Sequence, residues 1–351
     1  MITSNEIAQL HVELSTKCQA MCPLCLRNDY GFKTRNDFPK IDLSYNDWKK
    51  IFDTTNLCNL KEVLFCGNFG DPLIAPDLEL IVSDCFKRWP HVNVNIHTNG
   101  GMRTPNWWEN FGRTFKNKNL NVHFSIDGLE DTNHLYRINV PYEKVIENAK
   151  AFINAGGSAQ WKFILFKHNR HQIAIAKTRS QELGFTQFIV ENMTTPFKTI
   201  RNKGLVFQSD TDSYMILPAY GQTTVEKLNR YEPILETEEE YQKKNLEEEV
   251  FWKQANQKPI CHTINYKSVY LAANGQVFPC CYLGKFYDNY NWNKRRHNWE
   301  VIGKVENNAL EVGFDKAIDW FYKVQNTWQY STVKQGAMSE CVRCARRNPS
   351  I

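Results

Sequence analysis

The chain has 351 residues, of which 42% are hydrophobic and 23% are charged, and its formal net charge is +5. This length suffices for one large α/β domain with a smaller second domain, or for a single elaborated barrel. So mild a charge does not call for a nucleic-acid partner. No stretch approaches the roughly 20 apolar residues of a membrane span. We therefore expect neither a nucleic acid nor a membrane as a partner.

The first half of the chain alternates between strand-like and helix-like segments. Strands are predicted at residues 8–15, 60–67, 92–98, 119–126, 159–166 and 186–192. Helices are predicted at residues 44–55, 77–89, 105–115, 142–156 and 172–184, the first with Ser44 as its N-cap and the third with a proline at its start. Six β-then-α units in a row imply parallel strands joined by right-handed crossovers, in a barrel or an open doubly wound sheet.

The alternation ends near residue 193. Residues 194–259 are polar and include an acidic run at 235–250, which we interpret as a solvated helix with Glu and Lys at helical spacing. We therefore expect three parts: a core at residues 1–193, a polar linker or cover segment at 194–259 and a second domain at 260–351.

The cysteines indicate the compartment. The first residues show no basic segment followed by an apolar run, so we expect a cytoplasmic protein without a signal peptide. In a reducing compartment, clustered cysteines are more often metal ligands than disulfides. Of the eleven cysteines, Cys58, Cys66 and Cys85 fall within predicted helices or strands or beside them, and we interpret these three as core thiols.

A loop after the first predicted strand carries Cys18, Cys22 and Cys25, spaced C-x3-C-x2-C. Loops at the carboxyl ends of parallel strands build the active sites of α/β proteins. A closed structural metal site takes four protein ligands, whereas a catalytic site keeps one position open. Three thiolates around a four-iron cluster would leave one iron free for substrate or cosubstrate. A zinc site or a chance cluster is the alternative.

This cysteine spacing after a first strand resembles the radical S-adenosylmethionine (radical SAM) enzymes. The resemblance covers roughly residues 5–192 and implies a partial (β/α)6 TIM-like barrel. It also implies that Cys18, Cys22 and Cys25 ligate three irons of a [4Fe-4S] cluster, while the methionine moiety of S-adenosyl-L-methionine chelates the fourth. One-electron reduction would then release a 5′-deoxyadenosyl radical, with an external reductant such as flavodoxin or ferredoxin as the electron source.

Further segments match the family's cosubstrate-binding motifs in order. Gly70-Asp71-Pro72 follows the second strand and resembles the Gly-Gly-Glu-Pro segment, with Asp in place of the commoner Glu. The resemblance implies that Arg137 binds the methionine carboxylate, although an exposed loop arginine is an equal alternative. The cosubstrate contacts implied in this way are Leu24, Gly70, Asp71, Thr98, Asn99, Ser125, Asp127 and Arg137.

The C-terminal cysteines surround a predicted β-hairpin with an Asn274-Gly275 turn. The spacing from Cys261 through Gly275 to Cys280 resembles the start of the SPASM domain, and only Cys341 and Cys344 follow. The layout therefore looks like the shortened twitch form with one auxiliary [4Fe-4S] cluster, although four thiolates suit structural zinc equally well. Because neighbouring strand residues point to opposite faces, we expect Cys280 rather than Cys281 to be the ligand.

These features together predict a radical SAM oxidoreductase whose auxiliary cluster transfers electrons. We favour a small-molecule dehydrogenase, because the first strand begins within about ten residues and leaves no room for a peptide-binding module before it. The alternatives are a peptide- or protein-modifying maturase and a zinc-stabilised binding protein without catalytic activity.

Overall fold

The structure, a computed structural model, describes residues 2–28, 34–35, 39–192, 205–208, 213–216, 261–284, 301–330, 335–338, 341 and 344. The helix predicted at 235–250 lies outside the described residues. Within them, no helix combines the length and the apolar character that crossing a membrane requires.

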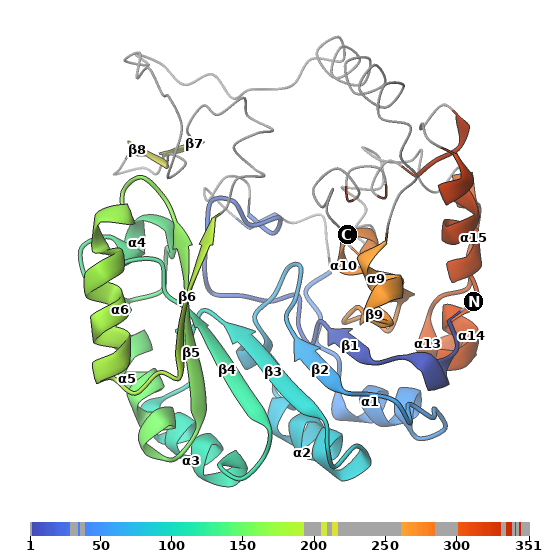
Figure 1. Cartoon of the computed structure of the whole chain (residues 1–351), viewed down its shortest axis with the longest axis horizontal. Coiled ribbons are helices and arrows are strands. Elements are labelled where there is room, and N and C mark those ends of the chain that lie inside the picture. Colours follow the sequence, from blue (N-terminus) through green and yellow to red (C-terminus); the bar gives the residue numbers. More distant parts are fainter. Residues whose placement is uncertain are drawn as a thin grey trace.

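An eight-stranded sheet organises the fold, in the spatial order β10-β9-β1-β2-β3-β4-β5-β6 (Figure 1). Its first six strands in the chain are β1 (Gln9–Val12), β2 (Glu62–Phe65), β3 (Asn93–Thr98), β4 (Leu120–Ser125), β5 (Ser158–Leu165) and β6 (Gln187–Asn192). Each of these pairs in parallel with the next. The predicted α/β class and the parallel order of a partial TIM-like barrel are therefore confirmed.

Helices connect these strands and lie along one face of the sheet (Figure 1). The longer ones are α1 (Tyr45–Phe52), α2 (Leu78–Arg88), α3 (Pro105–Phe115), α5 (Tyr142–Asn154) and α6 (Ile173–Glu182). The predicted N-cap is confirmed, because the Ser44 hydroxyl accepts a hydrogen bond from the Asp47 amide at 3.1 Å. Short helical turns add η1 (Ser4–Glu6), η2 (Pro72–Ile74), α4 (Asn133–Tyr136) and η3 (Arg170–Gln172).

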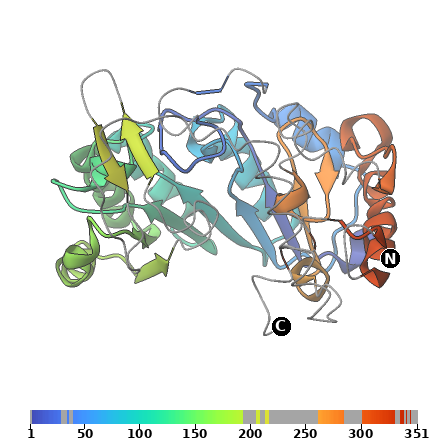
Figure 2. The ribbon, with the colours of Figure 1, turned by 90° about the horizontal axis from the view of Figure 1, so that it is seen from above.

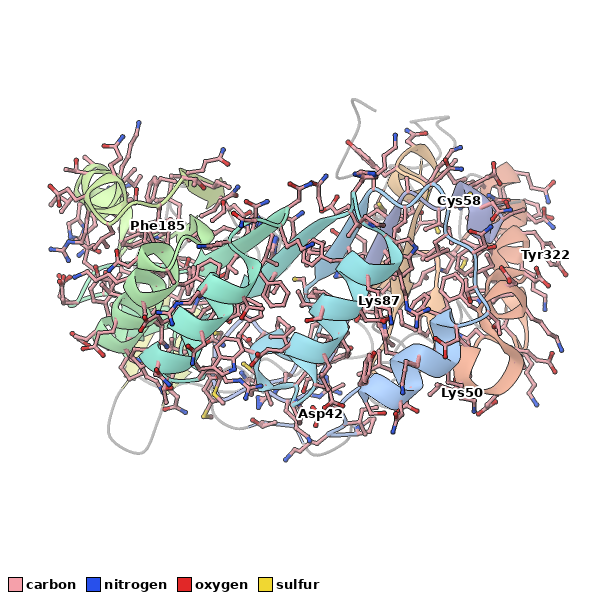
Figure 3. The ribbon with its side chains drawn as sticks, turned by 90° about the horizontal axis from the view of Figure 1, so that it is seen from below. Asp42, Lys50, Cys58, Lys87, Phe185 and Tyr322 are labelled. Atoms are coloured by element: carbon pink, nitrogen blue, oxygen red, sulfur yellow. The ribbon has the colours of Figure 1, made fainter. Side chains whose placement is uncertain are left out.

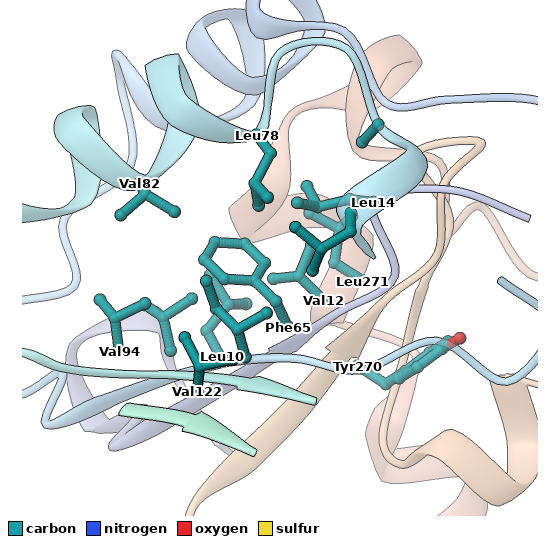
Figure 4. Close-up of a cluster of buried hydrophobic side chains, with 14 of the residues drawn as sticks. Leu10, Val12, Leu14, Phe65, Leu78, Val82, Val94, Val122, Tyr270 and Leu271 are labelled. Carbon is teal, nitrogen blue, oxygen red and sulfur yellow. The ribbon is translucent and has the colours of Figure 1, made fainter. Parts of the chain in front are cut away.

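The main core lies between the sheet and these helices. Figure 4 shows Phe65 of β2 packed near Leu78 and Val82 of α2, with Val94 of β3 alongside. Each such side chain contributes roughly 1.5–3 kcal/mol when it is fully buried. Exposed lysines such as Lys87 lie on the opposite side of the helices, toward solvent (Figure 3).

The other face of the six parallel strands, here called the inner face, is polar. Buried residues alternate along the strands with half-buried ones, as the period of two requires. The half-buried polar positions are Gln9, His11, Glu62, Asn95, His97, Asn121, His123, Ser125, Ser158, Gln160 and Lys162. Closed TIM barrels fill this space with branched apolar side chains, so a polar inner face indicates a surface that meets water or a ligand.

The C-terminal hairpin extends the same sheet. Strand β9 (Ser268–Leu271) pairs in parallel with β1, and β10 (Val277–Phe278) pairs antiparallel with β9. The predicted turn is present, with Gly275 at φ +83°. Figure 2 shows β9 and β10, in orange, at the opposite end of the sheet from the green β5. The domain boundary at residue 260 stays a prediction, but the hairpin is not detached from the core.

The remaining described elements follow or precede this hairpin. The C-terminal helices are α9 (His262–Asn265), α10 (Cys281–Gly284), α13 (Ala309–Val312), α14 (Phe314–Ile318), α15 (Phe321–Asn326) and η5 (Thr327–Gln329). The segment expected to be a linker or cover contains an antiparallel strand pair, β7 (Leu205–Gln208) and β8 (Ser213–Ile216), which the sequence did not predict.

Candidate functional site

The cysteine loop leaves the carboxyl end of β1 and is held by hydrogen bonds to the chain that returns toward α1. The Ser15 hydroxyl donates to Asp42 at 2.6 Å, and the Thr16 hydroxyl donates to the Pro39 carbonyl at 2.7 Å. Lys17 forms an ion pair with the same Asp42 at 2.5 Å. These contacts fix the start of the loop at the edge of the molecule marked by Asp42 in Figure 3.

The structure brings the three predicted ligands of this loop together. Burial raises the pKa of Cys18 and Cys25 and raises the pKa of Cys22 to about 11. The three thiols also lie within electrostatic range of one another, which raises the pKa values further because like charges repel. Nη1 of Arg137 lies 3.8 Å from Cys22 Sγ and opposes this rise.

The donor set at this loop is three thiols beside a guanidinium. A [4Fe-4S] cluster presents its irons at separate corners, so its thiolate ligands surround it instead of meeting at a point. Three soft thiolates beside a guanidinium therefore suit an iron-sulfur cluster with one iron left open, and Cys18, Cys22 and Cys25 would hold it.

The loop after β2 docks directly on the cysteine loop. The Asp71 amide donates to the Lys17 carbonyl at 2.9 Å. A Cβ atom on Gly70 would lie 1.8 Å from the Ser15 carbonyl oxygen, a backbone atom that has no room to move aside. Only glycine permits this approach, so the structure gives the predicted Gly70-Asp71 motif a steric reason.

The Asp71 carboxylate links this loop to the end of β3. It accepts hydrogen bonds from the Leu73 amide at 3.0 Å, the Thr98 hydroxyl at 2.9 Å, the Asn99 amide at 2.8 Å and Asn99 Nδ2 at 2.6 Å. Burial raises the pKa of Asp71, and these donors oppose the rise. Because the carboxylate is occupied by protein donors, Asp71 and Thr98 position the site through their side chains.

Asn99 also reaches the cysteine loop, a contact that the sequence did not reveal. Its Oδ1 accepts from Gln19 Nε2 at 2.6 Å, and its Nδ2 lies 3.5 Å from Cys18 Sγ. An N–H donor beside a sulfur stabilises its thiolate form. Gln19 was not predicted as a site residue. Its position inside the C-x3-C motif, directly after Cys18, is the sequence feature that could have indicated it.

Beyond β4, Asp127 and Arg137 form a buried ion pair with 2.6 Å between Oδ2 and Nε. The Asp127 side chain is fully buried and also accepts from the Ile164 amide at 2.6 Å. Arg137 is not the exposed loop arginine of the alternative interpretation, because its side chain is 13% exposed. The pair places a guanidinium against the thiols, with Ser125 at the end of the same strand and Leu24 half-buried in the cysteine loop.

Near the hairpin, a cavity of about 40 Å³ is lined by Cys261, Cys280 and Cys341. Its walls are otherwise largely apolar, with Ile2, Leu283, Phe321 and Val324. Cys344 lies within electrostatic range of Cys341, whose pKa burial raises to about 12. Four gathered thiols suit an iron-sulfur cluster or a zinc ion, and the residues that would hold either are the predicted ones.

Cys280 and Cys281 do not lie on a strand, so the predicted reason for preferring Cys280 was wrong. Strand β10 ends at Phe278 and Cys281 begins α10, so strand alternation does not govern these two residues. Cys280 lines the thiol cavity, whereas Cys281 lies within electrostatic range of Cys66. Asn68 Nδ2 donates to the Cys281 carbonyl at 2.9 Å, which joins the loop after β2 to the hairpin.

The three thiols interpreted as core residues differ from one another. Cys85 is fully buried in α2 and confirms the interpretation. Cys58 is exposed in the loop before β2 (Figure 3), so for this residue the interpretation was wrong. Cys66 follows β2 at the edge that carries the site, which the strand assignment did not show.

Glu13 is a further site residue that the sequence analysis missed. It follows β1 directly and is fully buried. Its carboxylate accepts from the Phe69 amide at 2.7 Å and from the Tyr270 hydroxyl at 3.0 Å. One side chain thus ties the loop after β2 to strand β9, and the Glu13–Tyr270 bond spans 257 positions of the chain. No local pattern marks such a contact.

No protein-family model matches this sequence, and no curated protein matches it. Solved structures do match. SuiB of Streptococcus suis, bound to its precursor peptide SuiA, is 15% identical with a TM-score of 0.49, and the match covers 90% of this chain. The chain spans 64% of the length of SuiB.

Two further solved structures are similar to this chain. anSMEcpe with bound AdoMet is 14% identical with a TM-score of 0.44, covering 78% of this chain and 74% of its own. BtrN in complex with AdoMet and 2-DOIA is 10% identical with a TM-score of 0.41, covering 95% and 96%. These neighbours are radical SAM enzymes of the SPASM or twitch type, the family that the sequence motifs resemble.

Proposed function

We propose that the chain is a radical SAM oxidoreductase with one auxiliary [4Fe-4S] cluster. The observation that carries the proposal is the gathering of Cys18, Cys22 and Cys25 beside Arg137 at the carboxyl edge of a parallel sheet. Three thiolates without a fourth ligand suit a cluster with one open iron. S-adenosylmethionine bound at that iron supplies hydrogen abstraction through its 5′-deoxyadenosyl radical.

The residues around the thiols have distinct tasks in this proposal. Arg137 offsets negative charge at the thiolates and binds the methionine carboxylate, because a guanidinium forms strong charge-assisted hydrogen bonds. Asp127 holds the guanidinium in place from its buried position. Gly70 brings backbone close to the cysteine loop, and Ser125 contributes a hydroxyl at the end of β4.

The C-terminal thiols would hold the auxiliary cluster. A cluster with four protein ligands has no iron open to substrate, so we assign it to electron transfer. The substrate is a small molecule in our preferred version and a peptide in the alternative. Electrons would enter from an external one-electron reductant such as flavodoxin or ferredoxin.

Anaerobic reconstitution tests the proposal. We expect about eight irons per chain and a brown protein that cleaves S-adenosylmethionine when reduced. Replacing Cys18, Cys22 and Cys25 together by Ala should leave about half of the iron and abolish cleavage. Cys58→Ala, at an exposed thiol in the loop before β2, is the matched control and should change neither.

Two results would refute the assignment. Cleavage retained by the triple variant would show that the loop holds no such cluster. A colourless protein that binds zinc and takes up no iron under reconstitution would favour the zinc-stabilised binding protein instead.

A further inference from the structure

The inner face carries a single Lys or Arg among its positions on the six parallel strands, all of which the structure describes. This residue is Lys162 of β5, and its strand neighbour in the register is Ser125 of β4. Its amine forms an ion pair with Glu191 of the edge strand β6 at 2.6 Å. The Lys162 side chain is 18% exposed and that of Glu191 45%, so the cation is the better shielded partner.

Two histidines next to this cation are neutral. The rings of His97 and His123 are cross-strand neighbours, with centroids 4.3 Å apart. Burial lowers the pKa of His97 to about 2 and that of His123 to about 4, and the charge of Lys162 adds to both effects. At neutral pH the Lys162 amine therefore has uncharged polar neighbours on this side.

A chain of hydrogen bonds fixes which nitrogen of His123 carries its proton. Asn95 Nδ2 donates to Glu62 Oε1 at 2.8 Å, so the Asn95 oxygen faces His123. That oxygen lies 3.1 Å from His123 Nε2, which must therefore be the protonated nitrogen and the donor. Nδ1 is left as an acceptor, and it is buried with no hydrogen-bond partner among the residues that the structure describes. A buried acceptor of this kind costs free energy until a donor reaches it.

From this arrangement we infer that the substrate is a small organic anion, a carboxylate or a phosphate ester, that also carries a hydroxyl or N–H donor. Lys162 binds the anionic group in exchange for the more exposed Glu191 carboxylate, and His123 Nδ1 accepts from the donor after a small side-chain movement. The inference rests on the proposed function, which places the cosubstrate beside Ser125. It deepens that proposal by naming the substrate class.

The Lys162 amine and His123 Nδ1 recognise different groups of the ligand. A cation in a partly shielded site attracts an anion more strongly than it would in water, because the effective dielectric constant is lower. A buried acceptor discriminates against ligands without a matching donor, since the pairing is then lost. Together they favour hydroxylated anions over plain anions and over neutral polyols.

The test is calorimetric binding to the reconstituted holoenzyme, at constant ionic strength, with four probes. These are malate, succinate, glycerol 3-phosphate and glycerol. We expect saturable binding of malate or of glycerol 3-phosphate with a dissociation constant below about 10 mM. The first outcome identifies a carboxylate and the second a phosphate ester. Glycerol should not bind in this range.

Three variants locate the binding. Lys162→Met should weaken anion binding by about tenfold or more. His123→Phe should abolish the preference for malate over succinate while binding of succinate persists. Lys150→Met, at an exposed position on α5, is the matched control and should bind like the wild type.

The inference is overturned if no probe binds saturably, if Lys162→Met binds as tightly as the wild type, or if glycerol binds as well as the anions. Iron content and uncoupled S-adenosylmethionine cleavage are measured on the same samples. A sample that holds iron and cleaves the cosubstrate but binds no anion refutes this inference alone. A sample that binds the anion but holds no iron refutes the proposed function alone.

Discussion

Asp71→Asn is the sharpest test of how the site is built, because it changes charge without changing shape. The carboxylate receives hydrogen bonds from the Leu73 amide, the Thr98 hydroxyl and two N–H groups of Asn99. An amide at this position has one oxygen and one NH2 group. Whichever way it turns, the NH2 group faces at least one buried N–H donor.

The cost follows from the orientation that loses least. With its oxygen toward Asn99, the new amide faces the Leu73 amide with NH2 and loses that bond, while Thr98 can rotate its hydroxyl. Turning Asn99 instead would break its bonds with Gln19 and with the Gly101 amide. One unsatisfied buried donor and the weakening of the remaining charge-assisted bonds together cost about 3 kcal/mol.

Thermal unfolding of the apo protein, followed by circular dichroism, measures this loss. At about 2 °C per kcal/mol for a large domain, Tm should fall by about 6 °C. Asp77→Asn is the matched control, because that carboxylate accepts from the Tyr45 amide at 2.8 Å, and we expect a fall of about 2 °C there. Equal shifts for the two variants would show that Asp71 does not hold the loops together.

Three further predictions concern the cosubstrate, pH and the auxiliary thiols. Arg137→Ala should weaken S-adenosylmethionine binding by about tenfold or more while most of the iron is retained, and an unchanged binding constant would remove Arg137 from the site. Because the pKa of His97 is lowered to about 2, the folded state binds fewer protons than the unfolded state below pH 6.5, so stability falls with falling pH. Between pH 7.5 and 5 the free energy of unfolding should fall by about 2 kcal/mol through this residue. Urea titrations should show a smaller fall in His97→Gln but not in His91→Gln, at an exposed histidine, and equal falls would contradict the assignment. Cys280→Ser should lose the auxiliary iron and Cys281→Ser should keep it, and the reverse pattern would identify Cys281 as the ligand.

The six parallel strands and five long helices were predictable because their signals are local. Alternating apolar residues, an N-cap at Ser44 and the Asn274-Gly275 turn each act within a few residues of the chain. The cysteine loop was predictable for the same reason, since its three thiols lie within eight residues and follow a strand directly. The motifs after β2, β3 and β4 were readable because parallel order brings successive carboxyl ends to one edge of the sheet.

Only the tertiary structure decided which residues connect these motifs. Glu13 accepts a hydrogen bond from Tyr270, and Gln19 donates one to Asn99. The Asp71 carboxylate accepts a hydrogen bond from Thr98 at the end of β3. Each of these bonds joins side chains that lie far apart in the chain. The surroundings of Cys280 and Cys281 also depended on where β10 ends, since the strand stops at Phe278 and strand alternation does not extend to these two residues. Sequence patterns record local preference, whereas hydrogen bonds between distant loops exist only once the sheet has set the distance between them.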